Sequence, residues 1–145
     1  MTSEQHVAPG VRRIVLPLPL ALRNVNVYLI EGDRGWSIVD SGMHTPEAEA
    51  ELRAGLTGVG ISLADIRAAF ITHLHPDHLG MAGTIRDAGA EVLMHGPEIA
   101  RAREVWAADH RLINETYELF DKHGMPHDVD EGMRTAWIGM NDCRS

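Results

Sequence analysis

The feature that most limits how this chain can fold is a short apolar run that leads directly into a cluster of metal-binding side chains. Residues 69–72 (Ala-Phe-Ile-Thr) are apolar or β-branched, which is typical of a buried strand, and residues 73–78 follow as His-Leu-His-Pro-Asp-His. So many polar groups at the end of a buried strand are costly unless they bind something. The pattern therefore predicts a sheet with a ligand-binding loop at one edge, followed by helical residues up to Gly89.

The spacing H-x-H-x-D-H predicts two metal sites on one loop. In an extended segment His73 and His75 project to the same side, so both imidazoles can bind one ion at about 2.0–2.1 Å. Pro76 disfavours helix at His75 and turns the chain, so Asp77 and His78 point toward a second ion about 3.5–4 Å from the first. The chemistry indicated is attack by a metal-bound hydroxide on a carbonyl or phosphoryl centre. The alternative is a set of surface histidines at a helix start, with Asp77 as an N-cap.

The composition narrows the class of partner. With 145 residues, 44% of them apolar and 23% charged, the chain has room for one globular domain. Because the net charge of -8 would repel a phosphate backbone, we expect no nucleic-acid partner. The expected partner is a small-molecule substrate, on the grounds of the metal-hydroxide chemistry given above. Cys143 is the single cysteine, which excludes a disulfide framework and favours a reducing cytoplasm. Because no apolar run could span a membrane and no signal peptide is recognisable, we expect a soluble protein without a membrane partner.

Alternation and turn residues predict the other strands. Residues 11–20 contain Pro17 and Pro19, which remove two ladder donors, so this run is expected to be an edge strand or an extended lead-in and not a central strand. Residues 25–30 and 36–39 alternate on either side of a glycine-rich turn and predict a hairpin.

Helical periodicity accounts for most of the remaining chain. Thr45 and Pro46 form an N-cap and first-turn pair for a helix that ends near Gly58. Residues 91–94 are a further strand candidate, and residues 97–122 have the period of one long helix or two in series. The order of strands, helix, strand, helix, strand and then helices is typical of an α/β or α+β layered fold, with helices packed on a sheet.

A last helix is predicted to begin at Pro126. Its apolar face, which has no partner further along the sequence, consists of Val129, Met133, Trp137 and Met140. An apolar face of this kind needs a covering surface, so we expect a chain cut short and self-association through the uncovered surface.

Three segments resemble, in order and spacing, the metallo-β-lactamase-fold hydrolases, which include glyoxalase II and the lactamase-like thioester and lactone hydrolases. The segments are residues 26–30 (Asn-Val-Tyr-Leu-Ile), residues 36–42 (Trp-Ser-Ile-Val-Asp-Ser-Gly) and residues 69–78. The resemblance implies a metal-binding core at about residues 11–95 and a helical region at about residues 97–140. It implies that the chain is a single, incomplete domain of the αββα type, built on one mixed sheet with flanking helices.

The same resemblance implies a role for each residue of the motif. His73 and His75 would bind a first zinc ion and Asp77 and His78 a second, with Asp77 also orienting the attacking hydroxide as the catalytic residue. Asp40, in the loop after its strand, matches the carboxylate that supports the metals from beneath; the alternative is an ordinary turn aspartate. Two zinc ions are implied, with iron or manganese as other candidates.

The sequence departs from the family pattern downstream of the motif. The family completes its sites with a Gly-His-Ser/Thr segment, a carboxylate that bridges the metals and a final histidine, and this sequence has none of those segments. We expect His95 to be a polar cap and His110 and His123 to be solvated, which leaves His127 as the candidate recruit. The natural interpretation is the N-terminal half of a two-half enzyme.

Three functions fit these observations. The first is a zinc-dependent hydrolase of a small ester, thioester or lactone, since the acidic balance argues against a nuclease. The second is an inactive metal-binding half domain, because two ligands per ion fall short of the three protein ligands usual for catalytic zinc. The third is a non-haem iron redox enzyme of the same fold, since histidine and carboxylate ligands also suit iron.

Overall fold

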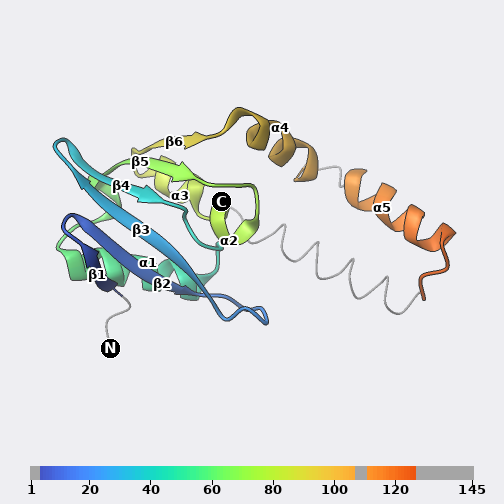
Figure 1. Cartoon of the computed structure of the whole chain (residues 1–145), viewed down its shortest axis with the longest axis horizontal. Helices are drawn as coiled ribbons and strands as arrows, with labels where there is room; N and C mark the ends of the chain where they lie inside the picture. Colours follow the sequence, from blue (N-terminus) through green and yellow to red (C-terminus); the bar gives the residue numbers. More distant parts are fainter. Residues whose placement is uncertain (1–3, 107–110, 127–145) are drawn as a thin grey trace.

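A computed structural model of the chain describes residues 4–106 and 111–126. Its centre is a six-stranded sheet in the order β1-β2-β3-β4-β5-β6 (Figure 1). The strands are β1 (Glu4–Ala8), β2 (Val11–Pro17), β3 (Asn24–Gly32), β4 (Gly35–Val39), β5 (Ile66–Ile71) and β6 (Glu91–Met94). Strands β1 to β4 pair antiparallel, whereas β4, β5 and β6 pair parallel. The predicted single mixed sheet with flanking helices is therefore confirmed.

The parallel pairs need crossover connections, and helices provide them. Helix α1 (Pro46–Val59) and the short 3-10 helix η1 (Leu63–Asp65) connect β4 to β5, and α2 (Pro76–Leu79) and α3 (Ala82–Asp87) connect β5 to β6. Two helices in series follow β6, namely α4 (Gly96–Val105) and α5 (Arg111–Lys122). The helix predicted beyond Pro126 lies outside the described residues. No described helix is long and apolar enough to cross a membrane.

The position of β2 corrects the prediction of an edge strand. β2 lies between β1 and β3, and the outermost position belongs to β1, for which no strand was predicted. The two prolines are tolerated because β1 pairs only with the part of β2 from Val11 to Ile14. Pro17 is the last residue of β2 and pairs with Asn24 on the β3 side alone. Its missing N–H therefore interrupts no bond to β1.

Helices α1 and α3 cover one face of the sheet (Figure 1). As the Thr-Pro pair predicts, Thr45 caps α1, and its hydroxyl oxygen accepts a hydrogen bond from the Ala48 N–H at 3.2 Å. Leu52, Leu56 and Ile85 are the largest buried side chains that these two helices contribute. They pack against sheet residues that alternate toward the same face, namely Ile14, Leu16, Val25, Val27, Leu29, Ile38, Ala69 and Ile71.

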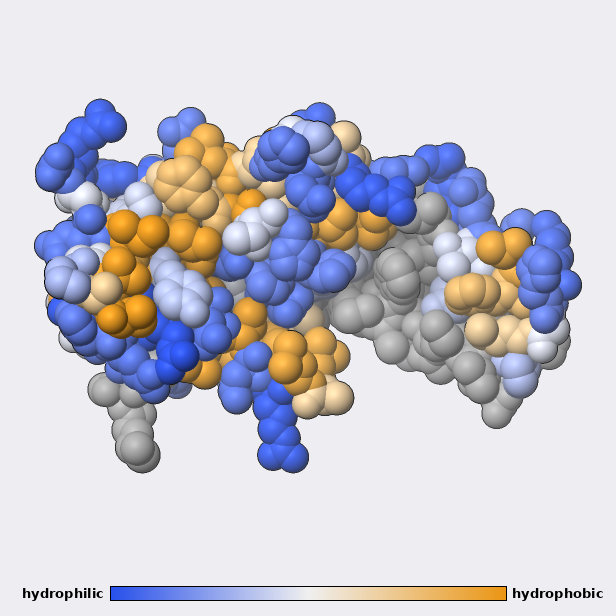
Figure 2. Space-filling model, viewed as in Figure 1, coloured by the Kyte–Doolittle hydropathy of each residue, from blue (hydrophilic) through white to orange (hydrophobic). Residues whose placement is uncertain are grey.

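The opposite face of the sheet carries an apolar row. The strand register aligns, from β3 to β6, the residues Tyr28, Val39, Phe70 and Leu93, and the charged Arg13 lies beside Tyr28 on β2. Phe70 is 45% exposed, and Ile30, on the same face of β3, is 42% exposed. In the view of Figure 2, hydrophobic residues gather in several patches over the part of the molecule that contains the sheet. Exposed apolar surface that is continuous across several strands is typical of an interaction surface.

The loop after β4 and the end of α2 pass each other with no room for a side chain. A Cβ atom on Gly80 would lie 2.5 Å from the Pro76 carbonyl oxygen, 2.6 Å from the Gly42 carbonyl oxygen and 2.7 Å from the His44 nitrogen. All three are backbone atoms, so no change of rotamer can relieve the overlap. This close approach brings residues 40–41 next to residues 77–78.

We expect Gly80→Ala to lower the free energy of unfolding by about 1–3 kcal/mol, because the added methyl group forces two backbone segments apart. Gly58→Ala is the matched control. Its Cβ would meet only the Glu4 Cβ at 3.9 Å, and alanine in a helix should leave stability unchanged or raise it by about 0.5–1 kcal/mol. Urea denaturation of both variants measures the difference, and equal effects would show that the close approach is not a constraint.

Candidate metal centre

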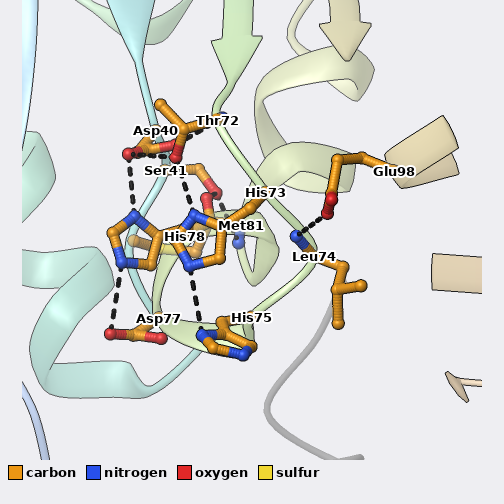
Figure 3. A network of polar contacts seen from close by, with 10 residues as sticks. All are labelled: Asp40, Ser41, Thr72, His73, Leu74, His75, Asp77, His78, Met81 and Glu98. Carbon is orange, nitrogen blue, oxygen red and sulfur yellow. Dashed lines mark hydrogen bonds and ion pairs between the residues drawn. The ribbon is translucent and has the colours of Figure 1, made fainter. Parts of the chain in front are cut away.

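The five predicted site residues lie together at one edge of the sheet (Figure 3). Because β4 and β5 are parallel neighbours, their carboxyl ends meet at that edge. Asp40 follows β4, His73 and His75 follow β5, and α2 carries Asp77 and His78. Sequence segments more than 30 residues apart therefore contribute to one cluster, as the hydrogen bond from the Thr72 N–H to Asp40 illustrates.

Asp40 connects the three elements that form the cluster. Its φ is 62°, a left-handed conformation that residues other than glycine rarely adopt, and only 6% of its surface is exposed. Its N–H donates to the Phe70 carbonyl oxygen at 2.9 Å. The carboxylate accepts a hydrogen bond from the Thr72 N–H at 2.8 Å, and its other oxygen lies 2.8 Å from His78 Nδ1. One buried carboxylate thus links β4, β5 and α2.

Thr72 extends this network to His73. Its hydroxyl oxygen lies 2.9 and 3.0 Å from the two Asp40 carboxylate oxygens and 2.9 Å from His73 Nδ1. A hydroxyl that donates its proton to Asp40 accepts a hydrogen bond from His73 Nδ1. An ionised carboxylate can only accept, so His78 Nδ1 donates to Asp40 directly. In a neutral imidazole with its proton on Nδ1, Nε2 is the nitrogen left to bind a metal. The role of the Thr72 hydroxyl has no signal in the sequence.

Each Nε2 atom lies near a second atom that could bind a metal, so the cluster contains two pairs of potential metal ligands. His73 Nε2 lies 3.1 Å from His75 Nδ1, and His78 Nε2 lies 3.5 Å from Asp77 Oδ2. Two ligands of one tetrahedral ion, with bonds of about 2.0–2.2 Å, lie roughly 3.3–3.6 Å apart, so both pairs are close to the spacing that a shared ion requires. The rings of His73 and His78 are 4.1 Å apart between centroids, which places the pairs side by side.

Within the part of the chain that the structure describes, each pair has two metal-binding atoms and no third. Over residues 4–106 and 111–126, no group of three or more His, Cys, Asp and Glu side chains is arranged to hold a metal ion. Of the later histidines, His95 is the N-cap residue of α4, but its side chain makes no capping hydrogen bond. His123 is exposed after α5, whereas His110 and His127 lie outside the described residues.

The surroundings of His73 favour the neutral form that binds metals. Burial lowers the pKa of His73 below its usual value, and the neighbouring His78 and His75 lower it further. The negative charges of Asp40 and Asp77 act in the opposite direction. A neutral imidazole keeps a nitrogen lone pair available as a ligand.

Ser41 fixes α2 against the loop that follows β4. Its hydroxyl donates to the His78 carbonyl oxygen at 2.8 Å and accepts a hydrogen bond from the Met81 N–H at 3.1 Å. Its own N–H also donates to the His78 carbonyl oxygen, at 2.8 Å. These bonds orient the backbone of His78, while Asp40 orients its ring. The sequence analysis did not assign a role to Ser41, because both partners lie far away along the chain.

Comparison with known proteins identifies the family. The model of the metallo-beta-lactamase superfamily matches residues 20–135. This chain belongs to the metallo-beta-lactamase superfamily, in agreement with the resemblance of the motif.

Individual relatives agree with this assignment. The chain is 37% identical over 95 residues to the probable metallo-hydrolase YqjP of Bacillus subtilis, covering 66% of this chain and 28% of that protein. The crystal structure of the metallo-beta-lactamase family protein TTHA1429 of Thermus thermophilus matches with a TM-score of 0.77 and 32% identity, over 88% of this chain and 42% of that one. A beta-lactamase domain protein of Burkholderia ambifaria matches with a TM-score of 0.62 and 27% identity, over 75% and 36%. The chain thus spans less than half the length of these relatives.

We expect Asp40→Asn to lower the free energy of unfolding of the metal-free chain by about 1–3 kcal/mol, because a buried carboxylate that accepts several hydrogen bonds is replaced by an amide. Asparagine has the same size and also tolerates a positive φ, so the change leaves the backbone and volume alone and removes the charge and one acceptor oxygen. Asp87→Asn is the control, since its carboxylate is exposed and bonds to the adjacent Arg86, and it should change stability by less than about 0.5 kcal/mol. Denaturation curves that shift equally for both variants would contradict a central role for Asp40.

Proposed function

We propose that this chain carries the metal-binding part of a hydrolase that cleaves a small ester, thioester or lactone. The supporting observation is the pair of two-donor sets, His73 with His75 and Asp77 with His78, at separations of 3.1 and 3.5 Å. Membership of the metallo-beta-lactamase superfamily supports the same class of activity. We propose zinc as the metal, with iron or manganese as alternatives that the same donors would accept.

Each residue of the cluster would have a distinct role in binding metal or orienting water. His73 and His75 would hold one ion through Nε2 and Nδ1, and His78 and Asp77 would hold the other through Nε2 and one carboxylate oxygen. The second Asp77 oxygen would orient the attacking water toward the substrate. Asp40 would keep the proton of His78 on Nδ1, so that Nε2 stays available. A bound divalent ion would act as a Lewis acid and make water a stronger nucleophile near neutral pH.

A neighbouring cavity supports a substrate with an apolar group. The cavity has a volume of about 470 Å³, within the usual range for small-molecule sites of roughly 300–1,000 Å³. His75 and Asp77 line it together with Arg101. Its remaining walls are apolar and consist of Leu20, Met43, Leu74, Pro76, Val105 and Trp106. We therefore propose that the acyl or ring portion of the substrate occupies this cavity beside the bond that is cleaved.

We also propose that the site and the sheet are completed by a second structural unit, so that the chain is one incomplete domain. Two donors per ion are fewer than the three protein ligands usual for catalytic zinc. The open face of the sheet, with Tyr28, Val39, Phe70 and Leu93 in one row, offers the surface against which such a unit would pack. An inactive metal-binding half domain is the second candidate function, and the same two-donor count favours it.

The decisive experiment measures metal and turnover on the same samples. His75→Ala should remove most of the bound zinc, because one of two donors is lost, whereas His95→Ala should bind zinc like the original chain. Even slow hydrolysis of a phenyl thioester or a simple lactone that a chelator and His75→Ala both abolish, and His95→Ala does not, would support the hydrolase. Zinc bound in full with no turnover favours the half domain, and equal zinc loss in both variants would overturn the metal site.

The open face leads to a prediction about assembly. The isolated chain should self-associate through this apolar row, and Phe70→Lys should shift it toward the monomer in sedimentation velocity, because a charge is placed in the centre of the row. Leu119→Lys is the matched control, since Leu119 is similarly exposed at 52% but lies on α5. An original chain that remains monomeric at high concentration would contradict the proposal of an uncovered face.

A further inference from the structure

Helix α4 contacts the loop between the two histidines of the first pair. The Leu74 N–H donates a hydrogen bond to the Glu98 carboxylate at 3.1 Å (Figure 3). The indole N–H of Trp106 donates to the Leu74 carbonyl oxygen at 2.8 Å. Glu98 lies in the first turn of α4 and Trp106 is its C-cap residue, so the two side chains come from opposite ends of one helix.

These two bonds fix the backbone that separates His73 from His75. The Leu74 N–H belongs to the peptide group that joins it to His73, and the Leu74 carbonyl belongs to the peptide group that joins it to His75. Each peptide group is a rigid plane, so anchoring both leaves little freedom for the relative positions of the two imidazoles. The anchors matter here because β5 ends at Ile71, and Leu74 lies beyond the strand ladder.

We propose that Glu98 and Trp106 are positioning residues, which hold Leu74 so that His73 Nε2 and His75 Nδ1 are spaced for one shared ion. The inference rests on the proposed metal site and extends it to a helix that bears none of the proposed ligands. Partners bonded directly to ligating side chains typically change metal affinity by about 10–100-fold when they are removed. Glu98 and Trp106 act through the Leu74 backbone, so we expect the lower end of that range.

The same geometry connects the helix to the proposed substrate cavity. Leu74 and Trp106 both line that cavity, as does Val105 at the end of α4. A substrate group packed against the Trp106 indole would therefore contact the residue that holds the histidine loop. Loss of the indole N–H in Trp106→Phe should accordingly weaken metal binding even though an aromatic ring remains beside the cavity.

Three variants separate an acceptor role from a charge or a purely structural role. Glu98→Ala removes the acceptor for the Leu74 N–H, whereas Glu98→Gln keeps an oxygen acceptor and removes the charge. Trp106→Phe keeps an aromatic ring and removes the donor. Glu104→Ala is the matched control, because Glu104 lies on the same helix and its carboxylate pairs with Arg101 instead of the loop.

The experiment is a competition titration of zinc against a chromophoric chelator on the full chain, together with thermal unfolding without metal and hydrogen exchange of the Leu74 amide. Glu98→Ala and Trp106→Phe should weaken zinc binding by about 10-fold, with little change in the metal-free melting temperature. Glu98→Gln and Glu104→Ala should bind zinc within a few-fold of the original chain. In Glu98→Ala the Leu74 amide should also exchange faster.

The possible failures are distinguishable. If the original chain binds no zinc, the proposed function fails, and the positioning role fails with it. If the original chain binds zinc and both Glu98→Ala and Trp106→Phe bind it equally well, the positioning role alone is overturned. If Glu98→Gln binds zinc as weakly as Glu98→Ala, a neutral acceptor for the Leu74 N–H does not suffice. That result would overturn the assignment of Glu98 as a simple hydrogen-bond acceptor. Should Glu98→Ala fail to fold, Trp106→Phe decides the question.

Discussion

The arrangement of the site depends on the hydrogen bonds that the buried Asp40 carboxylate accepts. The carboxylate bonds to the Thr72 N–H after β5 and to the ring of His78 on α2, and it does so from a strained backbone conformation at the end of β4. Strain of this kind persists only where the surroundings over-determine it. Here the parallel pairing of β4 with β5 and the close approach at Gly80 supply that constraint. The sheet topology therefore fixes the hydrogen bonds of Asp40, and these bonds in turn orient the histidine rings.

Local patterns predicted the elements whose causes are local. The Thr-Pro cap located the start of α1, and the apolar run at residues 91–94 coincides with β6, because capping and local apolar runs depend on near neighbours. The run at residues 69–72 overlaps β5, which begins earlier, at Ile66, and ends at Ile71. The place of β2 was predicted wrongly, because whether a proline interrupts a sheet depends on where the neighbouring strand ends. That information lies in the register of β1, whose own sequence, Glu4–Ala8, has a weak strand pattern.

The same distinction applies to the candidate site. His73, His75, Asp77 and His78 could be found from the sequence because they are adjacent in it, and the tertiary fold only has to turn the chain at Pro76. Ser41, Glu98 and Trp106 act on this segment from positions 24 to 37 residues away, through one or two hydrogen bonds each. In many proteins, a serine, a glutamate in the first turn of a helix and a half-buried tryptophan have purely structural roles. Only the folded chain shows their shared target.

The apolar row on the open face and the polar cluster at the sheet edge are physically coupled. Val39 and Phe70 belong to the row, and the residues that follow them on β4 and β5 lead directly into the cluster: Asp40 comes next after Val39, and its N–H bonds to the carbonyl of Phe70. A surface that packs on the row therefore also lies against the strand ends that hold Asp40 and Thr72. Excluding water there would lower the local dielectric constant and strengthen the bonds between Asp40, Thr72 and His78. Any surface that packs against the open face of the sheet would thus also make the proposed metal site more rigid.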